Sequence, residues 1–284
     1  MSQPFDVLVV GGGLVGATAA LAIAGTGVTV GVVDRMRPAF NPGRFGMDIR
    51  NIACSPASRD LLVDVGVWPD LLATPYSRME VWEDRGTAAL EFSAAEMGRC
   101  ELGWILENSP AVLALWARME RHPRITIRLG EVAGLVLEED RVMVELEDET
   151  LTARLVVGVD GARSVVRQLV NAGTEELATG QQALATIVRT EKEHGGVALQ
   201  RFLLDGPLAL LPSRESGAAS VVWSQSPDEA NRRMSLTDDA FCAEIETAIE
   251  SRLGRVLDVD RRFVFPLTQH VVRDFNPARR VLLI

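Results

Sequence analysis

An apolar run, a glycine-rich break and a second apolar run open the chain. Val7–Val10 contains no polar residue, which is typical of a strand buried on both faces. Five alanines between Ala17 and Ala24 then favour a helix that packs close to a sheet. Val28–Val33 predicts a second strand, which ends at Asp34. The pattern therefore predicts a strand, a tight turn, a helix and a second strand.

The pattern changes after Ala172. Strand-length runs rich in Val, Leu, Ile, Thr and Phe alternate with glycine, proline and charged segments, which predicts an antiparallel sheet. These runs cover residues 183–191, 196–204, 208–212 and 218–224. An apolar residue then recurs every four positions from Phe241 to Leu253, which predicts a helix over residues 238–253.

Two more apolar runs have the character of parallel strands. Val156 begins the segment VVGVDGARSVVR, a strand followed by an Asp160-Gly161 turn and a helix that starts near Ser164. An Asp-Gly turn after a strand is common and has little functional meaning alone. Val281 to Ile284 predicts a further buried strand, of a kind that normally continues into a glycine-rich turn and a helix.

Composition and charge narrow the function classes. The 47% hydrophobic content is that of a folded protein, and a net charge of −10 argues against nucleic acid as a partner. Three widely spaced cysteines suggest reduced thiols in the cytoplasm, with no disulfide framework. The three histidines are too dispersed for a metal site. The apolar N-terminal run contains consecutive glycines and reads as a strand, and no segment has the length of a membrane-spanning helix.

The first glycine-rich turn has the chemistry of a dinucleotide site. Gly11, Gly13 and Gly16 fit the pattern GxGxxG between a strand and a helix, and Asp34 follows about 20 residues on. Gly11 permits the tight turn, Gly13 lets the backbone approach a pyrophosphate, and Gly16 allows close helix packing. The helix start, with Leu14 and Val15, offers free N–H donors, and Asp34 would accept hydrogen bonds from a ribose. The motif indicates an ADP moiety without specifying the dinucleotide.

Several other residues allow two interpretations. Arg50 is either a surface arginine or a ligand of phosphate or flavin-edge oxygens. For His194, between two predicted strands, we favour a solvated loop residue over a proton-handling one. We expect the aromatic side chains Trp104, Trp223 and Phe202 to be core residues more readily than substrate-stacking ones.

The motifs together resemble one enzyme family. GxGxxG with Asp34-Arg35, then Asp48 and Arg50 with two following serines, then GxDGxxSxxR from Gly158 are similar to flavin-dependent aromatic hydroxylases of the para-hydroxybenzoate hydroxylase type. The chain most resembles the ubiquinone-biosynthesis hydroxylases, which act on polyprenylated phenols. The likeness continues through the segments LGWILEN and QRFLLDGPLALLP, and so covers nearly the whole chain.

The resemblance implies an α/β fold with two domains. The first is a Rossmann-like FAD-binding domain with a parallel sheet, formed by residues 1–75 and 100–172, with 273–284 as its final strand. The second is a mainly antiparallel β-sheet domain of α+β type that binds substrate, formed by residues 76–99 and 173–272. The active site is expected between them, because interdomain clefts commonly hold ligands.

The resemblance also implies an activity. It predicts an FAD-dependent monooxygenase that uses NAD(P)H and O2 to hydroxylate a prenylated phenol through a flavin hydroperoxide. The implied FAD-binding residues are Gly11, Gly13, Leu14, Val15, Gly16, Asp34, Arg35, Arg50, Asp160 and Gly161. No catalytic side chain and no metal are assigned. A cytoplasmic location is expected, and peripheral contact with the inner membrane, contact with other ubiquinone-biosynthesis proteins and homo-oligomerisation stay open.

Two departures from the family pattern keep an alternative open. In the family, a strand like the one ending at Ile284 runs into a Gly-Asp segment that contacts FAD, so we expect the chain to be part of a longer enzyme. Val112 stands where relatives usually carry an Arg or Gln that reaches the flavin. The alternatives are a non-catalytic accessory protein, or a fragment that is inactive without its C-terminal part. A related reducing or halogenating flavoprotein is less favoured, because no WxWxIP segment is present.

Overall fold

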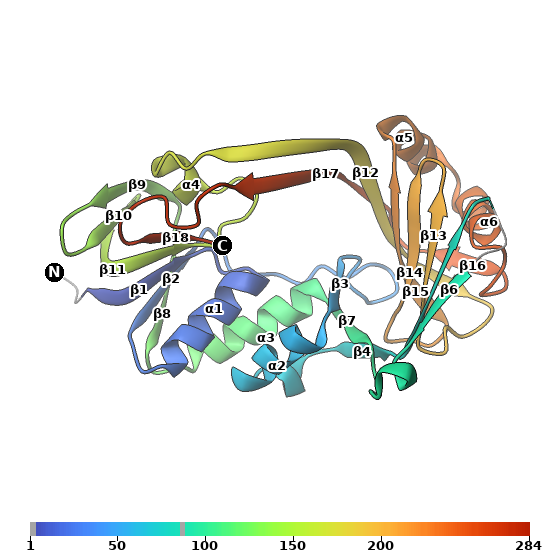
Figure 1. Cartoon of the computed structure of the whole chain (residues 1–284), viewed down its shortest axis with the longest axis horizontal. Helices are drawn as coiled ribbons and strands as arrows, with labels where there is room; N and C mark the ends of the chain where they lie inside the picture. Colours follow the sequence, from blue (N-terminus) through green and yellow to red (C-terminus); the bar gives the residue numbers. More distant parts are fainter. Residues whose placement is uncertain (1–3, 86–88) are drawn as a thin grey trace.

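Two large sheets organise the molecule and lie at opposite ends of it (Figure 1). The structure is a computed structural model that describes residues 4–85 and 89–284. In the first sheet five strands are parallel, in the spatial order β8, β2, β1, β11 and β18. Their bounds are Ile125–Leu129 for β8, Val30–Asp34 for β2, Phe5–Val10 for β1, Thr150–Gly158 for β11 and Val281–Leu283 for β18.

The predicted strand–turn–helix–strand unit and the final strand are both confirmed. β18 pairs in parallel with β11, with Val281 opposite Val156. The sheet is not wholly parallel, however, because β9 (Val132–Leu137) and β10 (Val142–Leu146) extend it with antiparallel pairing. Turns of only a few residues link β9 to β10 and β10 to β11, and such short connections allow only antiparallel neighbours.

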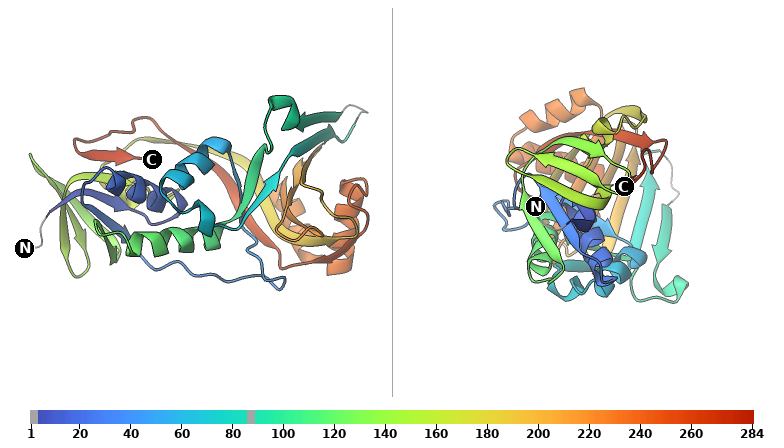
Figure 2. Two further views of the ribbon diagram at one scale, coloured as in Figure 1. Left: turned by 90° about the horizontal axis from the view of Figure 1, so that it is seen from below. Right: turned by 90° about the vertical axis from the view of Figure 1, so that its left-hand side faces the viewer.

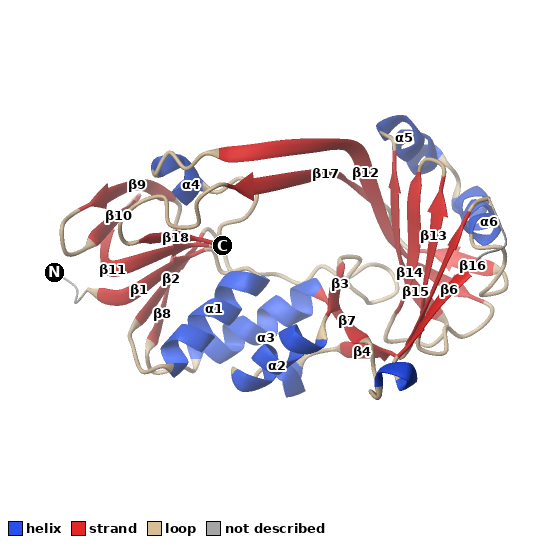
Figure 3. Cartoon of the chain, viewed as in Figure 1, coloured by secondary structure: helices blue, strands red, loops and turns tan. Residues whose placement is uncertain are grey.

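Helices pack on both faces of the first sheet (Figure 3). α1 (Leu14–Gly25) and α3 (Asn108–Glu120) bury one apolar cluster with β1 and β2, and α2 (Pro56–Asp64) joins it through Leu62. α4 (Val165–Leu169) contributes Val166 to a cluster on the other face. Val112 lies in the first cluster, so this side chain is used for core packing.

The second sheet has eight strands and is mainly antiparallel, as predicted. Its order is β16, β12, β15, β14, β13, β5 and β6, with β17 paired to β12. Among the described strand pairs of this sheet, only β5–β13 is parallel. The bounds are Arg78–Glu83 (β5), Ala89–Ser93 (β6), Thr174–Thr190 (β12), Val197–Leu203 (β13), Gly206–Pro212 (β14), Ala218–Gln225 (β15), Val256–Val259 (β16) and Phe263–Val272 (β17).

Three connections join the two ends of the molecule. The long strands β12 and β17 run side by side from the first sheet to the second (Figure 1). A small sheet of three strands lies below them, formed by β3 (Asn51–Cys54), β4 (Ala73–Tyr76) and β7 (Gly103–Glu107), with short 3-10 turns at Trp68–Asp70 and Ala95–Met97. The loop between β2 and β3 also crosses to the second sheet (Figure 2).

Asp260 anchors that loop to the second sheet. Its buried carboxylate accepts hydrogen bonds from the backbone N–H groups of Arg44 (3.0 Å) and Phe45 (2.9 Å). A Cβ added to Gly43 would come within 2.5 Å of the same carboxylate, so the loop backbone approaches it closely. Met47 continues the contact in a small apolar cluster with Ile187 and Ala218. The loop is therefore held against the sheet before it returns to β3.

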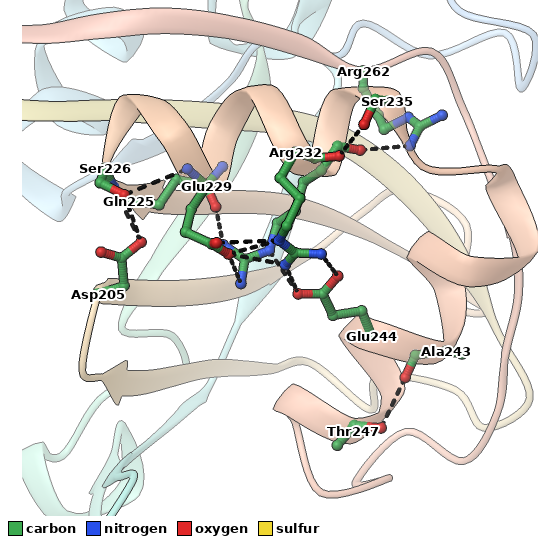
Figure 4. Close-up of polar contacts among 11 residues, drawn as sticks. Asp205, Gln225, Ser226, Glu229, Arg232, Ser235, Ala243, Glu244, Thr247 and Arg262 are labelled. Atoms are coloured by element: carbon green, nitrogen blue, oxygen red, sulfur yellow. Dashed lines mark hydrogen bonds and ion pairs between the residues drawn. The ribbon is translucent and has the colours of Figure 1, made fainter.

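Two helices cover the outer face of the second sheet, α5 (Pro227–Ser235) and α6 (Asp238–Ala248). Charged side chains join them: Arg232 bonds Glu229 and Glu244 (Figure 4), and Arg233 also pairs with Glu244. The predicted helix over residues 238–253 is wrong beyond Ala248, because Glu250 and Ser251 have positive φ angles. Ile249 and Leu253 are still buried, which explains why their spacing looked helical.

The two faces of the second sheet differ in what they contact. Trp223 is only 2% exposed and packs in the cluster beneath α6, as expected for a core residue. Phe202 is 47% exposed, so the prediction that it belongs to the core is wrong. Side chains alternate along a strand, so Phe202 lies on the face away from that of its neighbour Arg201, which donates a hydrogen bond to the end of α6. Trp104 is half-buried and packs edge-on against Trp68, with ring centroids 5.3 Å apart.

The three thiols should differ sharply in reactivity. Cys54 and Cys242 are buried and Cys100 is exposed. Burial raises the pKa of the Cys54 thiol, and burial with nearby carboxylates raises the pKa of Cys242 to about 11. Because the thiolate is the reactive form, we expect a disulfide reagent at pH 8 to titrate one thiol rapidly in the native protein and all three after denaturation. Two or three rapidly reacting thiols in the native protein would contradict this arrangement.

Candidate functional site: a cavity at the carboxyl ends of the parallel strands

A cavity of about 620 Å³ lies where β1, β2 and β11 end. Ligands commonly bind at this edge of a parallel sheet, outside the carboxyl ends of the strands. Loops after β1, β2, β8 and β11 supply nearly all of its wall. The lining residues are Val10, Gly11, Gly13, Val33, Asp34, Arg35, Arg50, Gly130, Glu131, Val132, Val159, Asp160, Gly161, Arg163 and Val165.

Seven of the ten residues expected to bind the cofactor line this cavity. Leu14, Val15 and Gly16 do not. Leu14 packs against the core beneath α1, Val15 is 55% exposed, and Gly16 is buried in the turn. The loop positions Gly130–Val132 and the side chain of Arg163 line the cavity without having been expected. Arg163 could have been found, since it lies inside the GxDGxxSxxR motif, whereas Gly130–Val132 carries no motif.

The glycines shape the turn by close backbone contacts. Gly11 has a φ of +108°, and a Cβ there would lie 2.4 Å from the carbonyl oxygen of Val159. A Cβ on Gly16 would lie 1.9 Å from the carbonyl oxygen of Gly11. Gly16 was expected to permit helix packing against the sheet, and its tightest neighbour is in fact the turn itself. Gly13 has open space where its side chain would be, so its backbone is accessible from the cavity.

Asp34 fixes the same turn from the neighbouring strand. Its Oδ2 accepts a hydrogen bond from the Gly12 N–H at 2.6 Å, and its Oδ1 accepts one from the Met36 N–H at 3.2 Å. The Trp116 indole Nε1 donates to the carbonyl oxygen of Gly12 at 2.7 Å. Asp34 therefore lines the cavity and also holds the backbone that frames it.

Asp160 plays a comparable part on the other side of the cavity. Its carboxylate accepts hydrogen bonds from the Ser164 hydroxyl and from the backbone N–H groups of Val165 and Val166. Ser164 in turn accepts from the Arg167 N–H and caps α4. The Asp-Gly turn is thus held in place by its own helix, and Gly161, with a φ of +81°, completes it.

The charge distribution of the cavity suits an anion. Arg35, Arg50 and Arg163 line it and are exposed. Within residues 4–85 and 89–284, none of these guanidinium groups forms an ion pair or a side-chain hydrogen bond. The carboxylate of Asp34 accepts from backbone N–H groups, and that of Asp160 accepts from backbone N–H groups and the Ser164 hydroxyl. The third acidic residue of the lining, Glu131, is exposed. The start of α1 adds the positive end of a helix dipole, which stabilises phosphate groups.

Two buried carboxylates lie behind Arg50. Asp48 and Glu107 are 8% and 5% exposed, and Glu107 Oε2 accepts from the Asp48 backbone N–H at 2.7 Å. Burial raises the pKa of Glu107, assisted by the nearby charge of Asp48 and opposed by the Asp48 N–H and by Arg214. Arg214 Nη1 approaches Glu107 Oε1 at 3.2 Å, an ion pair without hydrogen-bond geometry.

His194 lies away from the cavity. Its Nδ1 accepts from the Gly196 N–H and its Nε2 faces the carbonyl oxygen of Ser213, both at 3.0 Å. Both ring nitrogens therefore hold neighbouring loops together. His194 is therefore a half-buried residue that links two loops, and it is less solvated than the sequence predicts.

The residues of the cavity fit a dinucleotide. Gly11 and Gly16 could not carry a Cβ without displacing backbone, and Gly13 leaves its backbone open. Three arginines line the cavity with guanidinium groups that have no partner in the described part of the chain. This combination provides backbone N–H donors and positive charge for a pyrophosphate, beside a carboxylate suited to a ribose. The fit therefore rests on contacts of this chain as well as on the motif.

Comparison with known proteins agrees with this geometry. The sequence model of the FAD binding domain family matches residues 4–284. The chain is 36% identical over 283 residues to 3-demethoxyubiquinol 3-hydroxylase of Escherichia coli K12, covering 98% of this chain and 72% of that protein. It is 35% identical over 283 residues to the ubiquinone hydroxylase UbiL of Rhodospirillum rubrum, covering 98% of this chain and 65% of that one. The chain thus spans about two thirds of the length of these relatives.

Solved structures share the fold. PqsL of Pseudomonas aeruginosa in complex with 2-aminobenzoylacetate aligns with a TM-score of 0.82 at 19% identity, covering 99% of this chain and 78% of that one. The p-nitrophenol 4-monooxygenase PnpA of Pseudomonas putida aligns with a TM-score of 0.73 at 21% identity, covering 100% and 72%. The predicted fold class, an FAD-type α/β domain with a mainly antiparallel second sheet, is confirmed. By sequence, by fold and by the construction of its cavity, the chain belongs to the FAD binding domain family.

Proposed function

We propose that the protein is an FAD-dependent monooxygenase that hydroxylates the aromatic ring of a prenylated phenol in ubiquinone biosynthesis. The observation that carries the proposal is the cavity between the glycine turn and the Asp160-Gly161 turn, with three arginines that have no side-chain partner among the residues that the structure describes. The relatives named above, a 3-demethoxyubiquinol 3-hydroxylase and a ubiquinone hydroxylase, support the reaction class. NAD(P)H would serve as reductant and O2 as co-substrate.

The chain's own residues would bind and orient the cofactor. Gly11, Gly13 and the start of α1 would hold the pyrophosphate, and Asp34 the ribose. Arg35, Arg50, Asp160 and Gly161 would line the remaining length of the site, with Leu14, Val15 and Gly16 supporting the turn from behind. Bound FAD would supply the transfer of one oxygen atom to the ring. The protein would supply orientation and exclusion of water.

We propose the same division of the chain that the sequence indicated. The cofactor domain would comprise residues 1–75, 100–172 and 273–284, and the substrate domain residues 76–99 and 173–272. Residues 1–3 and 86–88, which these ranges include, lie outside the described residues. The sheet face that carries Phe202, away from α6, would meet the substrate.

The setting of the reaction belongs to the proposal too. No helix in the described part of the chain is long and apolar enough to cross a bilayer. We propose a cytoplasmic protein that meets its prenylated substrate at the inner membrane surface, in contact with other ubiquinone-biosynthesis proteins or as a homo-oligomer. Flotation of the protein with vesicles that contain a prenylphenol would test the membrane contact.

Turnover with labelled oxygen tests the activity. Purified protein with FAD, NADPH and a short-chain prenylphenol is expected to oxidise NADPH faster when the phenol is present, and to incorporate one atom of isotopically labelled dioxygen into the ring. The Gly16→Ala variant is the inactive control. Phenol-independent NADPH oxidation, or a product without label, would contradict the hydroxylase assignment.

A further inference from the structure

The buried acidic pair behind Arg50 has no part in the function proposed so far. Asp48 and Glu107 are both more than nine-tenths buried, on different segments of the chain. Asp48 precedes β3, and Glu107 ends β7 immediately before α3. Burying two carboxylates this deep in a fold is costly, because each must exchange its contacts with water for hydrogen bonds within the protein. Their position beside Arg50, which lines the cavity, therefore calls for a reason beyond packing.

Asp48 and the start of α3 fix the backbone of Arg50 on both sides. Asp48 Oδ1 accepts from the Arg50 N–H at 3.0 Å, and the Arg50 carbonyl accepts from the Asn108 N–H at 3.0 Å. Asp48 Oδ2 accepts from the Ser109 N–H at 2.7 Å, so the same carboxylate also holds the first turn of α3. Glu107 completes the arrangement by accepting from the Asp48 N–H at 2.7 Å.

Helix capping alone does not require this arrangement. α3 has no side-chain cap from its own N-cap residue, Glu107, so one oxygen of Asp48 would suffice as a substitute. The second oxygen is directed to the N–H of Arg50, the residue whose side chain reaches the cavity. An exposed arginine has many accessible rotamers, and fixing its backbone limits where its guanidinium group can lie.

A third residue ties this assembly to the second sheet. Arg214, in the loop between β14 and β15, approaches Glu107 Oε1 at 3.2 Å and donates from Nη2 to the Gly46 carbonyl at 2.6 Å. Asn51 Nδ2 adds a hydrogen bond to the Ser220 hydroxyl of β15 at 3.1 Å. These contacts connect the segment that carries Arg50 to the second sheet as well as to the first domain.

We propose that Asp48 and Glu107 are positioning residues that hold Arg50 over the cofactor cavity. The inference rests on the proposed function, because it takes FAD as the ligand of that cavity. Asp48 acts directly on the Arg50 backbone, and Glu107 acts through Asp48. Neither carboxylate needs to touch the cofactor.

A double-mutant cycle on FAD affinity tests the proposal. Arg50→Ala is expected to weaken FAD binding about tenfold or more, the usual loss for a hydrogen bond to a charged group. Asp48→Ala is expected to weaken it by a similar factor, and the double variant by no more than Arg50→Ala alone, because both act through one side chain. Flavin fluorescence titration measures the affinities. Hydrogen exchange of the apoprotein should show faster exchange at the Arg50 and Ser109 amides in Asp48→Ala.

Controls separate positioning from general destabilisation. Glu244→Gln removes a charged partner of Arg232 and Arg233 on the far face of the second sheet (Figure 4), and is expected to lower the melting temperature while leaving FAD affinity within about twofold. Asp48→Asn retains one acceptor oxygen and should give an intermediate affinity, which keeps the test decisive if Asp48→Ala does not fold.

The outcomes are distinguishable. Wild-type FAD affinity in a folded Asp48 variant, or effects of Asp48→Ala and Arg50→Ala that add fully, would overturn the positioning role while leaving the proposed function intact. Failure of the wild-type protein to bind FAD would overturn both.

Discussion

Replacing Gly16 by alanine is expected to abolish measurable FAD binding. The added Cβ would lie 1.9 Å from the Gly11 carbonyl oxygen, a backbone atom that cannot move without opening the turn. Gly11 itself is held by a hydrogen bond from its N–H to the Val33 carbonyl at 2.8 Å. Relieving such a contact costs about 3 kcal/mol, which corresponds to a loss of more than roughly a hundredfold in affinity. Flavin titration and thermal unfolding of the apoprotein measure the two consequences.

Gly25 gives the matched control in the same helix. It is exposed at the end of α1, its φ is not positive, and no atom of residues 4–85 or 89–284 lies within 4 Å of a Cβ added there. Gly25→Ala should leave FAD binding unchanged and leave stability equal or higher by about 0.5 kcal/mol, because alanine restricts the unfolded chain. Equal tolerance of alanine at Gly16 and Gly25 would show that the turn is not built as described.

Replacing Trp223 by alanine is expected to give the largest loss of stability in the second sheet. The side chain is 2% exposed, and the Arg233 guanidinium stacks 3.7 Å from the ring centroid. Emptying a site of this size costs about 3–5 kcal/mol, from lost burial and from the cavity left behind. Chemical denaturation with fluorescence or circular dichroism detection measures the change.

Phe202 is the natural comparison, because the sequence predicts a core position for both Phe202 and Trp223. It lies on the opposite face of the sheet and is 47% exposed, so Phe202→Ala should change the unfolding free energy by less than about 0.5 kcal/mol. A raised KM for the phenol with an unchanged unfolding transition would assign this side chain to substrate contact. A loss as large as that of Trp223→Ala would contradict the sheet orientation described above.

The sequence predicted the fold best where one local pattern determines the structure. The segment from Val7 to Asp34 carries apolar strand-length runs, glycine spacing and helix composition together, and all three features agree in the structure. Residues 249–253 show the opposite case. Their apolar spacing fitted a helix, but positive φ angles at Glu250 and Ser251 end it, while Ile249 and Leu253 stay buried by tertiary packing.

The site was predictable as far as motifs extend along the chain. The glycine turn, Asp34, Arg50 and the Asp160 turn all meet at one cavity. Gly130–Val132 joins them only because β8 pairs with β2, a long-range event that leaves no local signal. The Asp48–Glu107 contact could not be derived either, since 59 residues separate its partners and burial of both carboxylates is a property of the folded chain.

Flavin content is the measurement that tests the central claim most directly. The purified chain would be incubated with FAD, desalted, and examined by flavin absorbance against protein concentration, with folding confirmed by circular dichroism. We expect close to one FAD per chain in the wild-type protein and none in Gly16→Ala. A folded wild-type protein that emerges without flavin would contradict the assignment of this cavity to FAD.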